Sequence, residues 1–301
     1  MRGWIVLVCL LSALGCQTAG KIAQKGLSEL EDKGVITEGQ RESIERTATA
    51  LRTSFQDLTD KEEYYIGRAV SANILHRYSV YEDETVTAYV NKVGKTVAWA
   101  SDRPETYGGY HFLVLDTPDP LAYSAPGGFI FVSRGLMKMM ENEEELAGVL
   151  AHEVAHVNRR HGLSAIKQSR LMNAFSILVE EGKKYSSAEV KKLAEAYEGS
   201  LGDIIELLLE RGYSRSQEGE ADRLGALFAH RAGYDPQGLV SFLDTQSRAY
   251  GSSRGVPLLK THPNPGERRG SLQMHMKEEG MLGRTEVSRT SRFLKTREIL
   301  K

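Results

Sequence analysis

The stretch His152-Glu153-Val154-Ala155-His156 decides the fold of this 301-residue chain. It has the form H-E-x-x-H. On an α-helix, residues four apart lie on one face, one turn above each other, so His152 and His156 can bind one Zn²⁺ ion together. Glu153 lies beside the first ligand, where its carboxylate can act as general base for a metal-activated water. The stretch therefore predicts the two ligands and the base of a zinc metallopeptidase on one helical turn.

The sequence around this motif predicts that it lies inside a well-defined helix. Apolar residues recur at helical spacing up to the motif. Asn142 is expected to cap the N-terminus, with Glu145 as its capping-box partner. Glu143 and Glu144 suit the positive end of the helix dipole, and Gly162 is expected to end the helix. Such a helix would hold the two histidines rigidly.

A zinc site with two histidines needs a third protein ligand, and the candidate lies in residues 213–222. Glu218 and Asp222 are four residues apart and share one face of a second predicted helix, whereas Glu220 points about 200° around it. We therefore predict Glu218 as the third ligand. Asp222 is then placed to accept a hydrogen bond from the other ring nitrogen of a ligand histidine.

Four sequence motifs together resemble the M48 family of zinc metallopeptidases, with its Ste24-like and Oma1-like members. They are, in chain order, Pro126-Gly127-Gly128, His152 to His156, Glu218 to Asp222, and Thr261-His262-Pro263 followed by Arg268. The resemblance covers residues 58–269. It implies an α+β fold: a mainly helical, zincin-like metallopeptidase domain with a small β-sheet beside the active-site helix. It also implies one Zn²⁺ per chain.

His262 has two functional interpretations and one structural one. The resemblance places its loop near the metal, where the imidazole could stabilise the oxyanion or occupy the open metal position in a resting state. The alternative is a structural loop histidine. Arg268 is expected to pair with a buried carboxylate near the site, and His161 is expected to lie off the ligand face.

Two strands, at residues 110–115 and 129–133, are predicted before the motif helix, with extended chain at 121–125. Pro126-Gly127 suits the central positions of a type II turn. An exposed strand edge there could bind a peptide through main-chain hydrogen bonds; the alternative is a buried hairpin without substrate contact. The candidate substrate contacts are Tyr123, Ser124, Ala125, Gly127 and Gly128.

The N-terminus resembles a bacterial lipoprotein signal. Arg2 precedes an apolar stretch, residues 4–14, that is too short to span a bilayer comfortably. Cleavage before Cys16 would leave a single cysteine for lipidation and no internal disulfide. Gln17 follows it in place of an aspartate, which implies anchoring to the outer membrane, facing the periplasm. The alternative is an ordinary secretory signal with an incidental cysteine.

Hydrophobic residues make up 41% of the chain, which is ordinary for a globular protein, and we expect one principal domain. The net charge is −1 and 26% of residues are charged, which indicates no nucleic-acid partner. The predicted parts are a signal peptide (1–15), a tether with helical segments (16–58), the metallopeptidase domain (59–270) and a C-terminal tail (271–301). Further helices are expected at 59–78, 84–100, 163–179, 186–198, 201–209 and 235–249, with a loop at 251–265. The region 163–212 is a candidate cover for the cleft.

Two functions fit this sequence. The first is a lipid-anchored zinc endopeptidase that hydrolyses misfolded or unassembled envelope polypeptides, with the outer-membrane assembly machinery as a candidate partner. The second is a periplasmic chaperone or assembly factor that binds extended polypeptide and uses zinc structurally. Glu153 separates the two, because a structural metal site does not need a carboxylate beside its ligand.

Overall fold

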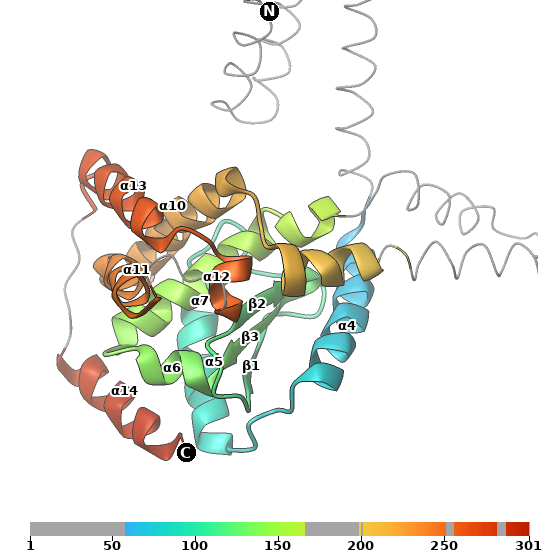
Figure 1. Cartoon of the computed structure of the whole chain (residues 1–301), viewed down its shortest axis with the longest axis horizontal. Coiled ribbons are helices and arrows are strands. Elements are labelled where there is room, and N and C mark those ends of the chain that lie inside the picture. Colours follow the sequence, from blue (N-terminus) through green and yellow to red (C-terminus); the bar gives the residue numbers. More distant parts are fainter. Residues whose placement is uncertain (1–57, 166–198, 200, 251–255, 282–286, 301) are drawn as a thin grey trace, which may run out of the picture. The chain divides into compact units, whose positions relative to one another are not determined.

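The computed structural model of this chain describes residues 58–165, 199, 201–250, 256–281 and 287–300. The lipoprotein signal with Cys16, the tether and nearly all of the helices expected at 163–179 and 186–198 lie outside these residues. Within them, every helix is too short or too polar to cross a bilayer. Figure 1 shows helices arranged around one small sheet, with α7 beside it.

Three short strands form the sheet: β1 (His111–Leu115), β2 (Ala122–Ala125) and β3 (Phe129–Ser133). Their order is β1-β3-β2, with β1 parallel and β2 antiparallel to β3. All three lie within one residue of the segments predicted as strands or extended chain. The small mixed sheet among many helices confirms the predicted α+β class.

The Pro126–Gly128 turn (η1) joins β2 to β3 and packs directly on α4 (Asp60–Arg77). Gly127 has φ 77° and ψ 3°, the values that the second central position of a type II turn requires. A Cβ at Gly67 of α4 would lie 1.8 Å from the Pro126 carbonyl oxygen. The Gly127 N–H donates to Glu63 Oε1 over 3.0 Å. These contacts fix the end of β2.

Helices are the other regular elements of the described chain. Besides α4 they are α5 (Glu84–Trp99), α6 (Arg134–Met139), α7 (Glu143–Asn158), η2 (His161–Ala165), η3 (Leu207–Arg211), α10 (Arg215–Arg231), α11 (Gln237–Tyr250), α12 (Pro257–Thr261), α13 (Pro265–Glu278) and α14 (Val287–Ile299). Helices α4, α5, α7, α10 and α11 begin close to where the sequence predicts, whereas α6 and α13 were not predicted. The segment 251–265, expected as a loop, contains α12, which begins with a proline at N1 as short helices often do. Residues 287–299, placed in a tail, form α14 against α5 and α7.

Helix α7 is buried along almost its whole length. The Asn142 side chain accepts from the Glu145 N–H over 2.9 Å, as expected of the cap. The Glu145 carboxylate, however, accepts from Glu141 N rather than from Asn142 N, so the capping box does not form. The helix also ends at Asn158, before Gly162, because Arg160 itself adopts the left-handed conformation with φ 53°.

Two glycines let neighbouring helices cross α7 at close range. A Cβ at Gly225 of α10 would lie 2.9 Å from the Cα and N of His152. A Cβ at Gly238 of α11 would lie 2.2 Å from the Glu144 carbonyl oxygen. Any larger residue would therefore push these helices off α7, so the glycines set the spacing between the segments that carry the site.

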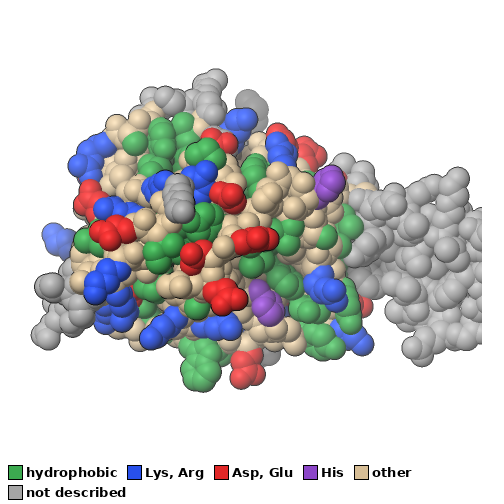
Figure 2. Space-filling model, turned by 90° about the horizontal axis from the view of Figure 1, so that it is seen from below, with side chains coloured by type: hydrophobic (Ala, Val, Ile, Leu, Met, Phe, Trp, Pro, Cys, Tyr) green, Lys and Arg blue, Asp and Glu red, His purple; other side chains and the backbone are tan. Residues whose placement is uncertain are grey.

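The surface carries charges of both signs. On the face shown in Figure 2, acidic and basic side chains are interspersed with apolar ones, in keeping with the net charge of −1.

Candidate metal centre

Four side chains from three helical segments converge beside α7: His152 and His156 on α7, Glu218 on α10 and His262 at the end of α12. Each offers one nitrogen or oxygen, and these atoms all lie within 4.8 Å of one another. All four residues are at most 4% exposed. Convergence of this kind, remote from water, is what a metal ion with few protein ligands requires.

The distances among three of these groups suit a tetrahedral ion. His152 Nε2 lies 3.0 Å from His156 Nε2. Glu218 lies 3.5 Å from His156 Nε2 through Oε1 and 3.7 Å from His152 Nε2 through Oε2. Two ligands bound at about 2.0–2.2 Å to a tetrahedral Zn²⁺ lie about 3.3–3.6 Å apart. The donor set therefore fits zinc in both chemistry and size.

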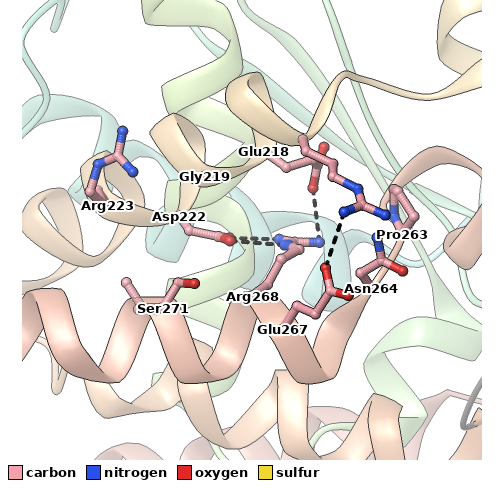
Figure 3. A pocket seen from close by; sticks show the side chains of 11 residues that line it. Glu218, Gly219, Asp222, Arg223, Pro263, Asn264, Glu267, Arg268 and Ser271 are labelled. Carbon is pink, nitrogen blue, oxygen red and sulfur yellow. Dashed lines mark hydrogen bonds and ion pairs between the residues drawn. The ribbon is translucent and has the colours of Figure 1, made fainter. Parts of the chain in front are cut away.

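Asp222 and Arg268 hold this set from behind. Asp222 Oδ1 lies 3.0 Å from His152 Nδ1, so the Nε2 atom is turned toward the other donors. Arg268 donates to both Asp222 oxygens, over 2.8 and 2.6 Å, and lies 2.8 Å from Glu218 Oε2. Figure 3 shows Arg268 between these two carboxylates. All three side chains help to line a surface cavity of about 150 Å³ at α10 and α13.

The electrostatics keep these groups in the protonation states that metal ligands need. Burial lowers the pKa of His156 well below its usual value, which favours neutral imidazole. Burial alone would raise the pKa of Glu218, but the charges of His262 and Arg268 outweigh it and hold that pKa well below its usual value. Burial and Arg268 oppose each other in the same way at Asp222, whose pKa is also lowered.

Glu153 differs from the other buried groups here. It is 1% exposed, and within the described chain its Oε2 atom has no hydrogen-bond partner. Its Oε1 atom lies 3.5 Å from His262 Nε2. A cavity of about 20 Å³, room for roughly one water molecule, is lined by Glu153 together with His152 and His262. A buried acceptor left unpaired beside such a cavity is placed to take a proton from a small molecule.

His262, the fourth candidate donor, directly contacts another of the donors. Its Nδ1 atom is 2.9 Å from Glu218 Oε1. Burial lowers the pKa of His262, but the charges of Glu218 and Glu153 outweigh it and raise that pKa. Its position is compatible with either functional interpretation.

The candidate substrate contacts divide into two groups. Tyr123, Ser124 and Ala125 lie on β2, one of the two edge strands of the sheet, and β2 contacts α7. All three are buried, so this edge is covered in the structure. Gly127 and Gly128 instead approach α4 and the loop before β1.

Sequence reasoning missed two residues that contact the candidate ligand His156. The Tyr213 ring stacks on the His156 ring, with centroids 3.9 Å apart and planes 17° apart. Burial raises the pKa of Tyr213 and the charge of Glu153 raises it further, whereas the neighbouring Ser124 hydroxyl lowers it. His161 Nδ1 lies 2.8 Å from His156 Nδ1, and Glu220 Oε2 lies 3.4 Å from His161 Nε2.

His161 is not among the four candidate donors, yet it contacts one of them, His156, through the ring nitrogen that faces away from the other donors. No helical pattern could show this, because α7 ends at Asn158 and the left-handed Arg160 turns the chain back. Glu220, set aside by helical phase as a ligand, supports His161 instead.

Several known metalloproteases and related proteins are similar to this chain in sequence. A putative beta-barrel assembly-enhancing protease of Vibrio cholerae is 26% identical over 268 residues, covering 87% of this chain and 50% of that protein. The beta-barrel assembly-enhancing protease of Escherichia coli K12 is 28% identical over 188 residues, 62% of this chain and 38% of that protein. The mitochondrial metalloendopeptidase OMA1 of Schizosaccharomyces pombe is 29% identical over 187 residues, 60% and 50%.

This chain spans half or less of the length of those relatives. The model of peptidase family M48 matches residues 84–275, which include the sheet, α7, α10 and all four candidate donors. The chain belongs to peptidase family M48.

Proposed function

We propose that this chain is a zinc-dependent endopeptidase. One observation carries the proposal: donors spaced for Zn²⁺ lie beside the buried Glu153 carboxylate, whose Oε2 atom has no partner among the described residues. A structural metal site gains nothing from an unpaired carboxylate, because a buried acceptor without a hydrogen bond destabilises the fold by about 1–3 kcal/mol. A general base needs that free acceptor.

His152, His156 and Glu218 would hold the ion, which when bound supplies Lewis-acid activation of the water and the carbonyl. Glu153 accepts a proton from the attacking water as the water oxygen adds to the scissile carbonyl carbon. The C–N bond then breaks, and Glu153 passes the proton to the leaving nitrogen. The burial of the site excludes bulk water and strengthens each of these electrostatic contacts.

The imidazole of His262 is proposed to block the site until a substrate binds. It contacts Glu218 and approaches Glu153, so it occupies space that a substrate carbonyl would need. Displacement of the imidazole on substrate binding would leave it next to the reacting carbonyl, where it could stabilise the oxyanion. The two roles predicted from the sequence can therefore follow one another.

The peptide substrate is proposed to bind along β2. This strand is at the edge of the sheet, where an extended chain can add through main-chain hydrogen bonds that tolerate many sequences. The side of β2 is covered in part by η3, with which it is in contact. Binding would therefore require η3 to move, so the 163–212 region, which contains η3, remains the candidate cover.

The proposed substrates are misfolded or unassembled envelope polypeptides. Two of the relatives are named beta-barrel assembly-enhancing proteases, which supports outer-membrane assembly as the setting. The proposed location is the outer membrane, facing the periplasm, through lipidation of Cys16, and it rests on the N-terminal sequence. The four-part division of the chain is likewise a prediction from sequence.

Replacing Glu153 by Gln tests the enzymatic proposal. The amide keeps the shape of the side chain but cannot accept a proton, so casein cleavage should be lost while zinc content stays at the wild-type level. The exposed Glu141, just before α7, provides the matched control: Glu141→Gln should cleave like the wild type. Cleavage by Glu153→Gln at the wild-type rate would refute the role of the base. Retained cellular function in that variant would favour the chaperone.

A further inference from the structure

Three buried side-chain oxygens near the metal donors lack a hydrogen-bond partner within the described residues: Glu153 Oε2, Ser124 Oγ and the Tyr213 hydroxyl. Glu153 is accounted for as the base. Ser124 lies on β2, the strand along which a substrate is proposed to pair. The Tyr213 hydroxyl has the Ser124 hydroxyl as a neighbour, and the proposed mechanism has not used it so far.

The Tyr213 ring is held in place. It stacks on His156 at 3.9 Å and lies 5.9 Å from the His161 ring and 6.1 Å from the His262 ring, centroid to centroid. The residue directly precedes Ser214, the N-cap of α10. The Tyr213 N–H donates to the Thr261 carbonyl over 3.3 Å, which joins it to the segment that carries His262.

The preceding glycine makes this approach possible. Gly212 has φ 73°, and a Cβ there would lie 2.5 Å from the Thr261 carbonyl oxygen. The backbone at Tyr213 is therefore pressed against the end of α12. A phenol fixed by a ring stack and by its own backbone is a preorganised donor, and preorganised donors lower a barrier most because they need no rearrangement during the reaction.

We propose that Tyr213 is a catalytic residue whose hydroxyl donates a hydrogen bond to the oxygen of the scissile carbonyl as that oxygen becomes an oxyanion. This inference rests on the proposed peptidase function. The water oxygen forms a bond to the carbonyl carbon, the π electrons move onto the carbonyl oxygen, and the water proton goes to Glu153. Tyr213 keeps its own proton throughout. When the carbonyl re-forms, the C–N bond breaks and Glu153 gives its proton to the nitrogen.

A structural tyrosine and a catalytic one respond differently to loss of the hydroxyl. Tyr213→Phe keeps the ring that stacks on His156 and removes an unpartnered buried oxygen, so the melting temperature should stay the same or rise. Tyr110 gives the matched control. It is buried, and its hydroxyl donates to the Arg103 carbonyl over 2.9 Å and accepts from Asn158. Tyr110→Phe should lower the melting temperature by about 2–4 °C and leave kcat/KM within about threefold of wild type.

The test measures cleavage of a fluorogenic peptide, zinc content, melting temperature and the Kd of a phosphinic peptide for the full-length zinc-loaded protein. The charged phosphinyl oxygens of that peptide imitate the oxyanion. For Tyr213→Phe we expect kcat to fall about 10²–10³-fold with KM within a few fold. The phosphinic peptide should bind less tightly by a similar factor, with zinc content unchanged.

Unchanged kcat and unchanged Kd of the phosphinic peptide would overturn the proposal, as would loss of zinc or a lower melting temperature in Tyr213→Phe, since these mark a structural role. Either result would leave the proposed function intact so long as the wild type cleaves and Glu153→Gln does not. A wild-type protein that cleaves nothing would overturn both.

Discussion

Helix α7 buries charged or ionisable side chains at both of its ends, and the two ends treat them differently. At the N-terminal end, Glu143, Glu144 and Glu145 are at most 2% exposed. Each is paired from elsewhere in the chain: Glu143 by Arg292, Tyr89 and Tyr234, Glu144 by Arg289 and Asp235 N, and Glu145 by Ser241 and Glu141 N.

At the other end, His152, Glu153 and His156 are just as buried, yet Glu153 Oε2 is unpaired in the described structure. Native proteins satisfy nearly all buried polar atoms, and the exceptions concentrate where chemistry is done. From this comparison we infer that the first end of α7 is a structural anchor (the anchor end), whereas the second end holds the proposed site (the working end).

The largest effect is expected from Glu218→Ala, which removes the third donor from the working end. Zinc content should fall from about one ion per chain to near zero, and peptide cleavage should be lost with it. Inductively coupled plasma mass spectrometry on the dialysed protein measures the first quantity. Glu267→Ala serves as control, because Glu267 lies on the same surface cavity but is exposed. Unchanged zinc in Glu218→Ala would place the third ligand elsewhere.

Substitutions at the anchor end of α7 should lower the stability of the fold and leave the rate of peptide cleavage unchanged. Arg292→Ala leaves the fully buried Glu143 carboxylate with only its two tyrosine partners, and because the Arg292 side chain is about half exposed, unfolding should become easier by about 1–3 kcal/mol. Urea titration followed by circular dichroism measures this change. The exposed Lys295 on the same helix gives the control Lys295→Ala, which should change little.

At a temperature where Arg292→Ala is fully folded, its kcat per zinc-loaded molecule should match the wild type. A large fall in kcat without a loss of stability would show that the anchor also acts on the chemistry, and the division between the two ends would then be wrong.

Much of this arrangement could be predicted from sequence, and the reason is helical periodicity. His152 and His156, like Glu218 and Asp222, are pairs four residues apart on helices, so local spacing alone places each pair on one face. The burial of Glu143 could not be predicted, because its partners lie 54 to 149 residues away in the chain. Sequence showed only an acidic first turn.

The missed residues share another property: they lie between helices. Tyr213 precedes an N-cap, and His161 follows the end of α7. Their positions depend on two left-handed residues, Gly212 and Arg160, with φ of 73° and 53°. The glycine could have suggested a turn, but an arginine gives no such signal. Only tertiary contacts determine where these two rings go.

A substitution where α10 crosses α7 should lower both the stability of the fold and the affinity for zinc. Gly225→Ala would place a Cβ 2.9 Å from His152 backbone atoms, so α10 must shift. We expect this shift to lower the free energy of unfolding by about 2 kcal/mol. The shift also moves Glu218 away from the histidines, so zinc should bind less tightly. Competition with a chromophoric chelator measures the affinity.

Gly219→Ala is the matched control for that crossing. It lies on the same helix, next to Glu218, and its added Cβ would meet only an Arg223 side-chain nitrogen at 3.5 Å. Because alanine favours helix over glycine by about 0.5–1 kcal/mol, this variant should be as stable as the wild type or slightly more so. Equal losses in the two variants would show that the close contact at Gly225 is unimportant.

The smallest expected effects on zinc affinity come from the two carboxylates that support the candidate ligand histidines, Asp222 and Glu220. Asp222 contacts His152 directly and is 2% exposed, whereas Glu220 reaches His156 only through His161 and is about two-fifths exposed on its side chain. Asp222→Asn should therefore weaken zinc binding about 10–100-fold, the usual range for a partner of a ligand histidine. Glu220→Gln should weaken it only a few fold, because water screens the outer contact and the amide can still accept from His161. If both substitutions weaken zinc binding equally, then Glu220 affects His156 through His161 as strongly as Asp222 affects His152 directly. Burial would then not explain how much each carboxylate contributes to zinc affinity.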